Sequence, residues 1–167
     1  DPTARVNALI GGNVDLISTI DAKAVKLIEE TAGVHVSSVP SGQYGGICCL
    51  TNTLPGYSDD FVMGLRYIQD RERIVRKIIK GHGVVGNDHP ISVAYGADHC
   101  SELAQREYDP DKAKWHLKRA HISSAEVVVA PVQTGIEDTC LLMQNNLRKI
   151  GFDLKVKKVP SDGYWGA

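Results

Sequence analysis

Residues 52–83, NTLPGYSDDFVMGLRYIQDRERIVRKIIKGHG, carry two helix starts in succession and organise the rest of the chain around them. Ser58 or Asp59 can cap a first helix and Asp70 a second, because short polar side chains accept hydrogen bonds from the first free amides of a helix. One side of the second helix is apolar, with residues at i, i+1, i+4 and i+5: Ile74, Val75, Ile78 and Ile79. This spacing predicts an amphipathic helix that faces a core.

The basic residues of the same stretch raise the question of nucleic-acid binding. They surround the apolar stripe of the second helix and are Arg71, Arg73, Arg76, Lys77 and Lys80. No aromatic side chains alternate with them, and the 19 basic and 20 acidic residues of the chain leave a net charge of −1. Nucleic-acid readers present a net basic surface. We therefore interpret these residues as a solvated helix face and expect no nucleic acid among the partners.

Upstream of this stretch, the sequence predicts helices and strands in alternation. The expected elements are a helix over residues 3–10, a strand over 14–18, a helix capped by Asp21, and strands over 34–39 and 46–52. The last two strands are joined by the turn-rich residues 40–45, PSGQYG. So short a connection is too short for a parallel crossover, and it predicts an antiparallel hairpin.

Downstream, residues 81–107 lack periodicity, and regular elements return after them. The expected elements are a helix capped by Asp109, a β-branched buried strand over 126–132, a helix with an apolar stripe from Ile136 to Ile150, and a strand over 153–159. Interleaved helices and strands predict the α/β (α+β) class, with a mixed sheet covered by helices. The chain has 167 residues, which predicts one domain over residues 1–167.

The cysteines and the apolar runs say little about the compartment. The four cysteines, none of them in a CxxC pair, are Cys48, Cys49, Cys100 and Cys140. Adjacent cysteines on a strand point to opposite faces, so we expect free thiols and no bond between Cys48 and Cys49. Cys48, Cys49 and Cys140 are expected in the core, and Cys100 is expected to be exposed. No apolar run approaches the roughly 20 residues of a membrane-spanning helix. The first residues, DPTARVNALIGG, show no signal-peptide pattern, which leaves the location open.

Candidate chemistry gathers in the irregular region, where four side chains could supply metal ligands or a thiol nucleophile: His82, His89, His99 and Cys100. Zinc sites usually show tighter paired spacings than these. Cys100 has no neighbouring pattern that would activate a thiol. The glycine-containing turns match no phosphate-binding loop. We therefore expect no catalytic residue, no metal and no cofactor, and an enzyme using this region is the least favoured alternative.

Four motifs, in order along the chain, resemble one family. They are RVNALIGGNVDLIS (residues 5–18), the whole of residues 52–83 with its DRxxIV pattern, YDPDKAKWHLKRA (108–120) and LMQNNLRKIGFDLKVKKVPSDGYW (142–165). This combination resembles the extracytoplasmic solute-binding proteins of peptide-type ABC transporters, the dipeptide, oligopeptide and nickel class. The resemblance covers nearly the whole chain.

The resemblance implies a bilobed clamshell that holds a solute between its lobes, with this chain corresponding to most of the distal lobe, the third domain of dipeptide-binding proteins. Relative to the family, the chain is then truncated at both ends. The implied function is non-catalytic binding of a peptide or related small molecule for import. The implied partners are the solute and the permease subunits of the transporter. The implied location is the periplasm or the cell surface.

In such proteins ligand contacts lie at strand ends that face the other lobe. The candidates in this sequence are Tyr44, Asn52, Gln133, Thr134, Tyr164 and Trp165. Some members use a basic residue for a peptide carboxylate just after the strand that matches VVVAPVQ, but this sequence continues with TGIED and has no Arg or Lys there. The departure leaves the ligand open among peptides, metal chelates, sugars and opine-like compounds.

A second hypothesis keeps the lobe but makes it the solute sensor of a transcription regulator, in which case a helix-turn-helix would precede Asp1. A separated lobe is also expected to expose an apolar patch where its neighbour belongs. On that ground we expect self-association of this chain.

Overall fold

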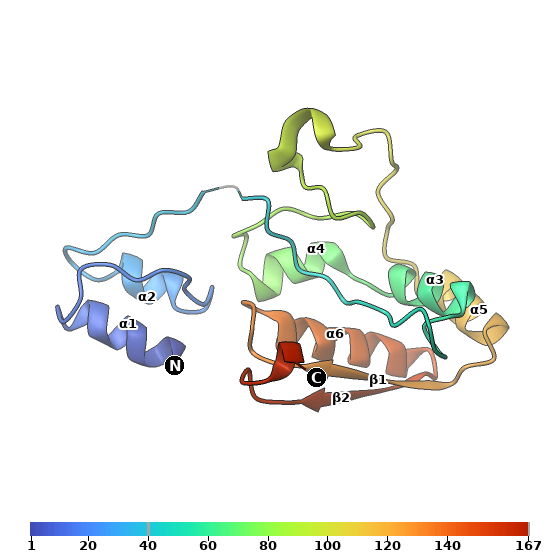
Figure 1. Ribbon diagram of the computed structural model, residues 1–167. Coiled ribbons are helices and arrows are strands. Elements are labelled where there is room, and N and C mark those ends of the chain that lie inside the picture. Colours follow the sequence, from blue (N-terminus) through green and yellow to red (C-terminus); the bar gives the residue numbers. More distant parts are fainter. Residues whose placement is uncertain (40, 167) are drawn as a thin grey trace.

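The computed structural model describes residues 1–39 and 41–166 and consists of helices around a small sheet (Figure 1). The helical elements are α1 (Pro2–Ile10), α2 (Val25–Glu29), α3 (Asp59–Tyr67), α4 (Arg71–Arg73), η1 (Ile74–Ile78), η2 (Val93–Asp98), α5 (Pro110–Arg119), α6 (Ile136–Lys149) and η3 (Tyr164–Gly166). The strands are β1 (Ser124–Val129) and β2 (Asp153–Lys158). The α/β class expected from the sequence is confirmed.

The sheet is one parallel pair, with Ser124 opposite Asp153 and Val129 opposite Lys158. Neighbouring parallel strands need a long crossover connection. In the sequence α6 lies between β1 and β2, and it makes this connection by running back along the sheet (Figure 1). The predicted strand after α5, the predicted helix with its long apolar stripe and the predicted final strand are therefore confirmed.

The core lies where α6, the sheet and the antiparallel pair α3 and α5 meet. Its buried residues are Phe61, Leu65, Ile68, Ala113, Leu117, Met143, Leu147, Phe152 and Leu154. Met143 and Leu147 belong to the apolar stripe of α6 and are almost fully excluded from solvent. A stripe at helical spacing can be buried in this way because the sheet and α3 cover it together.

Three of the four predicted helix caps are formed. The fourth is wrong, because α2 begins at Val25 after Ala24 and Asp21 makes no cap there. The amide of Phe61 donates to Ser58 Oγ at 3.3 Å, that of Arg73 to Asp70 Oδ1 at 3.1 Å, and that of Lys112 to Asp109 Oδ1 at 2.9 Å. Each cap satisfies an amide that has no partner inside its helix. The positions of α3, α4 and α5 in the sequence therefore follow from local chemistry.

The second helix of the opening stretch forms, but with a different backbone and less burial than expected. After α4 it continues as the π-helical turn η1. Its apolar residues are half-buried rather than buried: Ile74, Val75, Ile78 and Ile79. Its contacts with α6 explain the partial burial, since Ile78 Cγ2 approaches the backbone of Gly135, just before α6, so closely that a Cβ there would lie 2.7 Å away.

The predicted hairpin is wrong. Within residues 1–39 and 41–166 the ladder pairs belong to β1 and β2, whereas residues 14–18, 34–39 and 46–52 form no ladder. Pro40, in the expected turn, lies outside the described residues. Ile47 and Cys49 still pack against the core while Leu50 points to solvent. Extended chain thus places alternate residues of this segment on two faces, but a ladder also needs a neighbouring strand.

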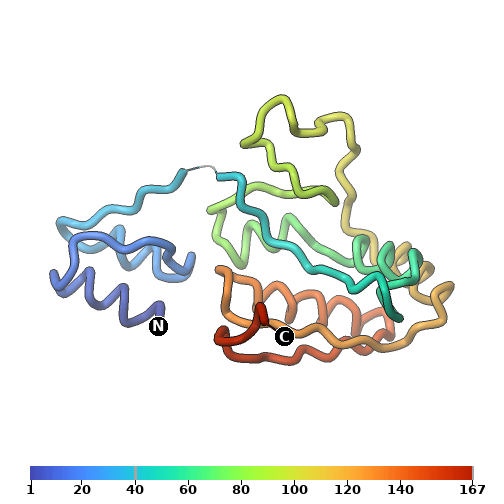
Figure 2. Tube along the Cα trace, in the orientation of Figure 1, coloured from blue at the N-terminus to red at the C-terminus, as the bar shows by residue number. Residues whose placement is uncertain are grey.

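The first part of the chain stands apart from the core described above (Figure 2). Its buried residues, Val6, Ala22, Val25 and Ile28, do not belong to the main cluster. It touches α6 through an ion pair of 2.6 Å between Lys23 Nζ and Asp138 Oδ2, both of them well exposed. Exposed pairs contribute little to stability. These four residues are therefore buried outside the main cluster. The single domain over residues 1–167 stays a prediction.

Gly64 sets the distance between α3 and α5, and its replacement is the first test of the fold. A Cβ at Gly64 would lie 2.7 Å from Leu117 Cγ and 3.3 Å from the carbonyl oxygen of Ala113. Overpacking of this kind costs roughly 1–3 kcal/mol, more than the gain of about 1 kcal/mol that alanine gives over glycine inside a helix. We expect Gly64→Ala to lower the free energy of unfolding in urea.

The matched control is Arg66→Ala on the exposed side of the same helix, for which we expect a change within about 0.5 kcal/mol. A Gly64→Ala variant as stable as the parent would show that α3 and α5 are not closely packed at this point.

Candidate functional site

The carboxyl ends of both strands lie at one edge of the sheet. Because the strands are parallel, Val129 and Lys158 are opposite each other at their ends. The amide of Val159 extends the contact by donating to the Val129 carbonyl at 2.9 Å. Loops that leave the carboxyl edge of a parallel sheet are where ligands usually bind. Four of the six candidate residues are on these two loops.

Gln133 and Thr134 are half-buried on the loop from β1 to α6. Gly135, at φ 75°, is the cap residue of α6, and no side chain makes a capping hydrogen bond there. The Gln133 and Thr134 side chains are therefore not used as helix caps. Their amide and hydroxyl groups remain available for polar contacts at the edge.

Tyr164 and Trp165 follow β2 and form the start of η3. Their ring centroids are 4.9 Å apart and the rings stand at 75°, an edge-to-face pair. Tyr164 is half-buried, whereas the Trp165 side chain is 82% exposed. An indole that is held on one side by a tyrosine and open on the other offers a flat surface for a ligand.

Tyr44 reaches the same edge from a distant part of the sequence. Its neighbour Gly45 packs against Gln133, so closely that a Cβ on Gly45 would lie 3.1 Å from Gln133 Nε2. The Tyr44 ring itself is 59% exposed. The structure therefore brings Tyr44 close to the β1 loop.

Asn52 does not lie at this edge. It comes shortly before α3, whose first turn meets the end of α5: Asp60 Oδ1 is 2.7 Å from His116 Nδ1, and Asp60 Oδ2 is 3.3 Å from Arg119 Nε. Because the chain runs from α5 directly into the amino end of β1, Asn52 is near the opposite edge of the sheet. The candidate site consequently contains five of the six predicted residues.

Charged groups beside the edge are paired. Lys158 Nζ lies 3.5 Å from Glu137 Oε1, and Lys23 Nζ lies 2.6 Å from Asp138 Oδ2. The hydrogen bond that Lys23 donates to Asp138, together with the negative charge of that carboxylate, raises the pKa of Lys23. The candidate residues themselves are uncharged, so this side of a ligand would meet aromatic rings and neutral hydrogen-bonding groups.

The region considered for metal or thiol chemistry has a different arrangement. The His89 and His99 rings are 5.0 Å apart, and His99 Nδ1 is 2.7 Å from the carbonyl oxygen of Ile91. Among residues 1–39 and 41–166, no group of three or more His, Cys, Asp or Glu side chains is placed to hold a metal ion. Through these contacts the two histidines help to order the loop.

The expected exposure of Cys100 and burial of Cys140 are confirmed, whereas the expected burial of Cys48 is wrong. Cys140, on α6, is buried and Cys49 is half-buried, but Cys48 and Cys100 are exposed. Cys48 and Cys49 alternate as expected for extended chain, and Cys100 lies in the long loop before α5. All four are free thiols.

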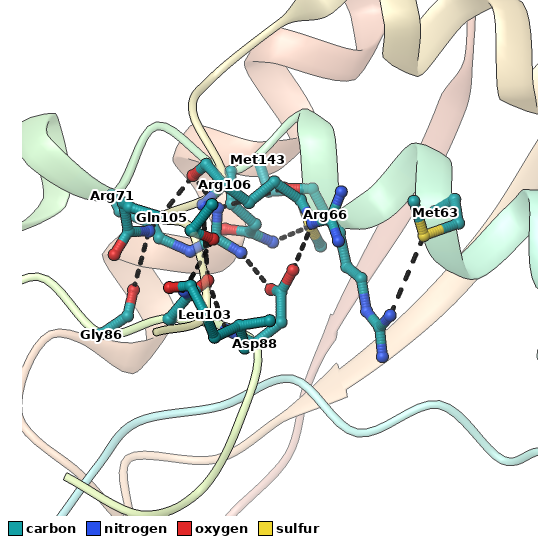
Figure 3. A network of polar contacts seen from close by, with 12 residues as sticks. Met63, Arg66, Arg71, Gly86, Asp88, Leu103, Gln105, Arg106 and Met143 are labelled. Carbon is teal, nitrogen blue, oxygen red and sulfur yellow. Dashed lines mark hydrogen bonds and ion pairs between the residues drawn. The ribbon is translucent and has the colours of Figure 1, made fainter. Parts of the chain in front are cut away.

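Sequence reasoning missed a polar network between α4 and the long irregular region (Figure 3). The Asp88 carboxylate accepts hydrogen bonds from both Arg71 and Arg106. The Arg106 guanidinium also lies 4.8 Å from the centre of the Tyr67 ring. Burial lowers the pKa of Arg71, and the hydrogen bond to Asp88 raises that of Arg106. Arg71 and Arg106 are 17 and 18 positions from Asp88 in the sequence, and no local spacing predicts either pair.

The comparisons with known proteins agree with this architecture. The family of bacterial extracellular solute-binding proteins, family 5, in its middle region, matches residues 1–167. The chain belongs to this family of extracellular, and therefore extracytoplasmic, solute-binding proteins. No curated protein matches the sequence of the chain. None of the helices in the described part of the chain is long and apolar enough to cross a membrane.

Several solved structures have the same fold. NikZ from Campylobacter jejuni, in complex with Ni(L-His), is 19% identical with a TM-score of 0.86 and covers 98% of this chain. DppA from Helicobacter pylori, in complex with the peptide STSA, is 18% identical with a TM-score of 0.81 and covers 98%. AppA from Bacillus subtilis, in complex with a nonapeptide, is 22% identical with a TM-score of 0.79 and covers 99%. The matched regions are 35%, 32% and 36% of those proteins, so this chain spans about a third of their length.

The reactivity of the cysteines tests how deeply each of them is buried. Burial raises the pKa of the Cys49 and Cys140 thiols, and a raised pKa leaves less of the reactive thiolate at a given pH. We expect iodoacetamide near neutral pH to alkylate Cys48 and Cys100 before Cys49 and Cys140, measured by peptide mass spectrometry over time.

The same reaction in urea is the control, since unfolding should bring all four rates together. Cys140 reacting as fast as Cys100 in the folded protein would contradict the burial of α6.

Proposed function

We propose that the intact protein binds a small solute between this lobe and the rest of its chain and delivers it to an ABC transporter, without making or breaking a bond. The observation that carries the proposal is the group of uncharged polar and aromatic side chains at the carboxyl edge of the sheet. Membership of the solute-binding family supports it. Closure of lobes around a ligand is the general working mode of such binding proteins.

The candidate contacts on this lobe are Tyr44, Gln133, Thr134, Tyr164 and Trp165. Trp165 and Tyr44 offer exposed rings, while Gln133 and Thr134 offer donors and acceptors on the loop between them. Such a combination fixes the orientation of a ligand by hydrogen bonds and excludes water by ring contact. We infer a peptide or a related small molecule as the ligand, in line with the peptide and Ni(L-His) ligands in the solved structures named above.

The proposal is tested by truncating two of these side chains in the intact protein. We expect Trp165→Ala and Gln133→Ala each to weaken solute binding by about tenfold, because an anchoring side chain contributes on the order of 1–2 kcal/mol. Calorimetric titration with a defined pool of peptides, and separately with nickel and histidine, measures the affinity.

Trp115→Ala is the matched control. Trp115 is 52% exposed on α5, where Arg119 covers its ring at 4.5 Å, away from the carboxyl edge. An intact protein that binds neither probe, or equal affinities for the Trp165 and Trp115 variants, would count against the proposed site.

We further propose that the 167-residue chain associates with itself when it is isolated. Three side chains in one turn region support this, with Leu50 75%, Leu54 74% and Tyr57 74% exposed. Apolar groups gathered in this way promote contact between copies. Sedimentation over a wide concentration range should show oligomers that Leu50→Ser with Leu54→Ser reduces, whereas a parent chain that stays monomeric would refute the idea.

A further inference from the structure

Two glycines let an extended segment lie directly against other parts of the molecule. A Cβ on Gly42 would lie 2.4 Å from the hydroxyl oxygen of Tyr95 and 2.5 Å from its ring carbon Cε2. A Cβ on Gly45 would lie 3.1 Å from Gln133 Nε2. Neither glycine has a positive φ. Glycine is therefore required here for close approach and not for backbone conformation.

These contacts hold residues 41–46, which we name the linker, at two points. Tyr95 contacts it at Gly42, and Gln133 contacts it at Gly45. A weaker hydrogen bond supports the first point, because Ser92 Oγ donates to the carbonyl oxygen of Ser41 at 3.4 Å. The linker connects the small body of α1 and α2 to the body that contains the sheet (Figures 1 and 2).

Tyr95 lies at the ordered tip of the loop that contacts the linker. Tyr95 belongs to the 3₁₀-helix η2. An amide in its first turn is capped, because Ala94 N donates to Ser92 Oγ at 3.1 Å. His99 Nδ1 lies 2.7 Å from the Ile91 carbonyl oxygen, which closes the tip behind Tyr95. The His89 and His99 rings pack against each other within the same tip. The Tyr95 ring thus has a defined position despite its exposed surroundings.

The base of this loop is fixed to the rest of the protein. Asn87 Nδ2 donates to the carbonyl oxygens of Leu103 at 3.1 Å and Ala104 at 3.0 Å, which pinches the two ends of the loop together. Asp88 then joins the base to Arg71 of α4 and to Arg106 (Figure 3). The Asp88 side chain is 12% exposed and that of Arg71 15%. Charge-assisted hydrogen bonds between largely buried groups are strong and directional.

We propose that residues 87–106 form a brace that positions the linker, with Tyr95 as the positioning residue that contacts it. Resting on the proposed function, the inference is that this brace holds the linker, and with it Tyr44 beside Gln133, in place at the candidate site before the solute binds. Tyr95 acts through Gly42 and does not contact the solute. Ordering a free linker at the moment of binding would cost conformational entropy, and a linker that is already held does not incur that cost.

A double-mutant cycle in the intact protein tests the brace. Gly42→Ala pushes the linker off the Tyr95 ring, and Tyr95→Ala removes the ring. We expect each to weaken binding of the peptide pool about tenfold, and the double variant to be no weaker than Tyr95→Ala, because residues in contact are not additive. Tyr95→Phe, which keeps the ring, should stay close to the parent.

Gly86→Ala is the matched glycine control, since a Cβ at Gly86 meets no atom within 4 Å and its φ is not positive. Thermal unfolding midpoints of all variants separate a loss of binding from a loss of stability. We expect these midpoints to stay close to the parent, because the Gly42–Tyr95 contact lies on the surface.

Small-angle scattering of the ligand-free protein supplies a readout that does not depend on any solute. Tyr95→Ala and Gly42→Ala should broaden the distribution of interatomic distances, and Gly86→Ala should not. A parent protein that binds no probe would refute the proposed function. The scattering of the ligand-free variants would still test whether the brace orders the linker. Single losses that multiply to about a hundredfold in the double variant, or unchanged scattering, would overturn the brace.

Discussion

The parallel pairing of β1 with β2 is the constraint on which the rest of the structure depends. Parallel strands cannot be joined by a tight turn, so α6 must cross back over the sheet, and its apolar stripe then forms the centre of the core. The same pairing brings the carboxyl ends of both strands to one edge. Loops from two distant parts of the sequence, after Val129 and after Lys158, meet there for that reason alone. A single topological requirement thus produces both the packing and the location of the candidate site.

What the sequence predicts well is what short-range chemistry decides. Ser58, Asp70 and Asp109 cap their helices as their side chains suggest, and the stripe from Ile136 to Ile150 forms one helix. Four of the six candidate residues also follow from their positions after strands. Residues 34–39 and 46–52 were predicted as two strands joined by the turn-rich residues between them, but apolar segments beside a turn do not by themselves supply a hydrogen-bonded neighbour. The same limit applies to Asn52, whose distance from the edge depends on how α3 packs on α5.

Contacts between distant residues are the part that the sequence could not supply. Asp88 lies in a stretch without periodicity, and its two arginines are reached only after the loop has folded back on itself. Gly42 and Gly45 look like ordinary turn residues in the sequence, whereas their role is to admit the Tyr95 ring and the Gln133 amide. A glycine that is needed for close approach carries no local signature, because the atom that excludes a Cβ belongs to another element. For this reason a glycine-rich stretch read as a hairpin turn became a held linker.

The neutral character of the carboxyl edge agrees with the proposed role of this lobe. Lys158 and Lys23 are engaged by Glu137 and Asp138, so they do not present free charge to a ligand. Ring contact and neutral hydrogen bonds depend on the shape of a ligand and only weakly on its net charge, whereas an ion pair selects one charge at one position. A lobe of this kind contributes surface and orientation, and charge selection then falls to groups on the facing part of a closed molecule. Affinity consequently depends on how accurately the surface of this lobe is held before the two parts meet. The linker carries Tyr44 and packs at Gly45 against Gln133, which is why its geometry matters to the site as much as the side chains within it.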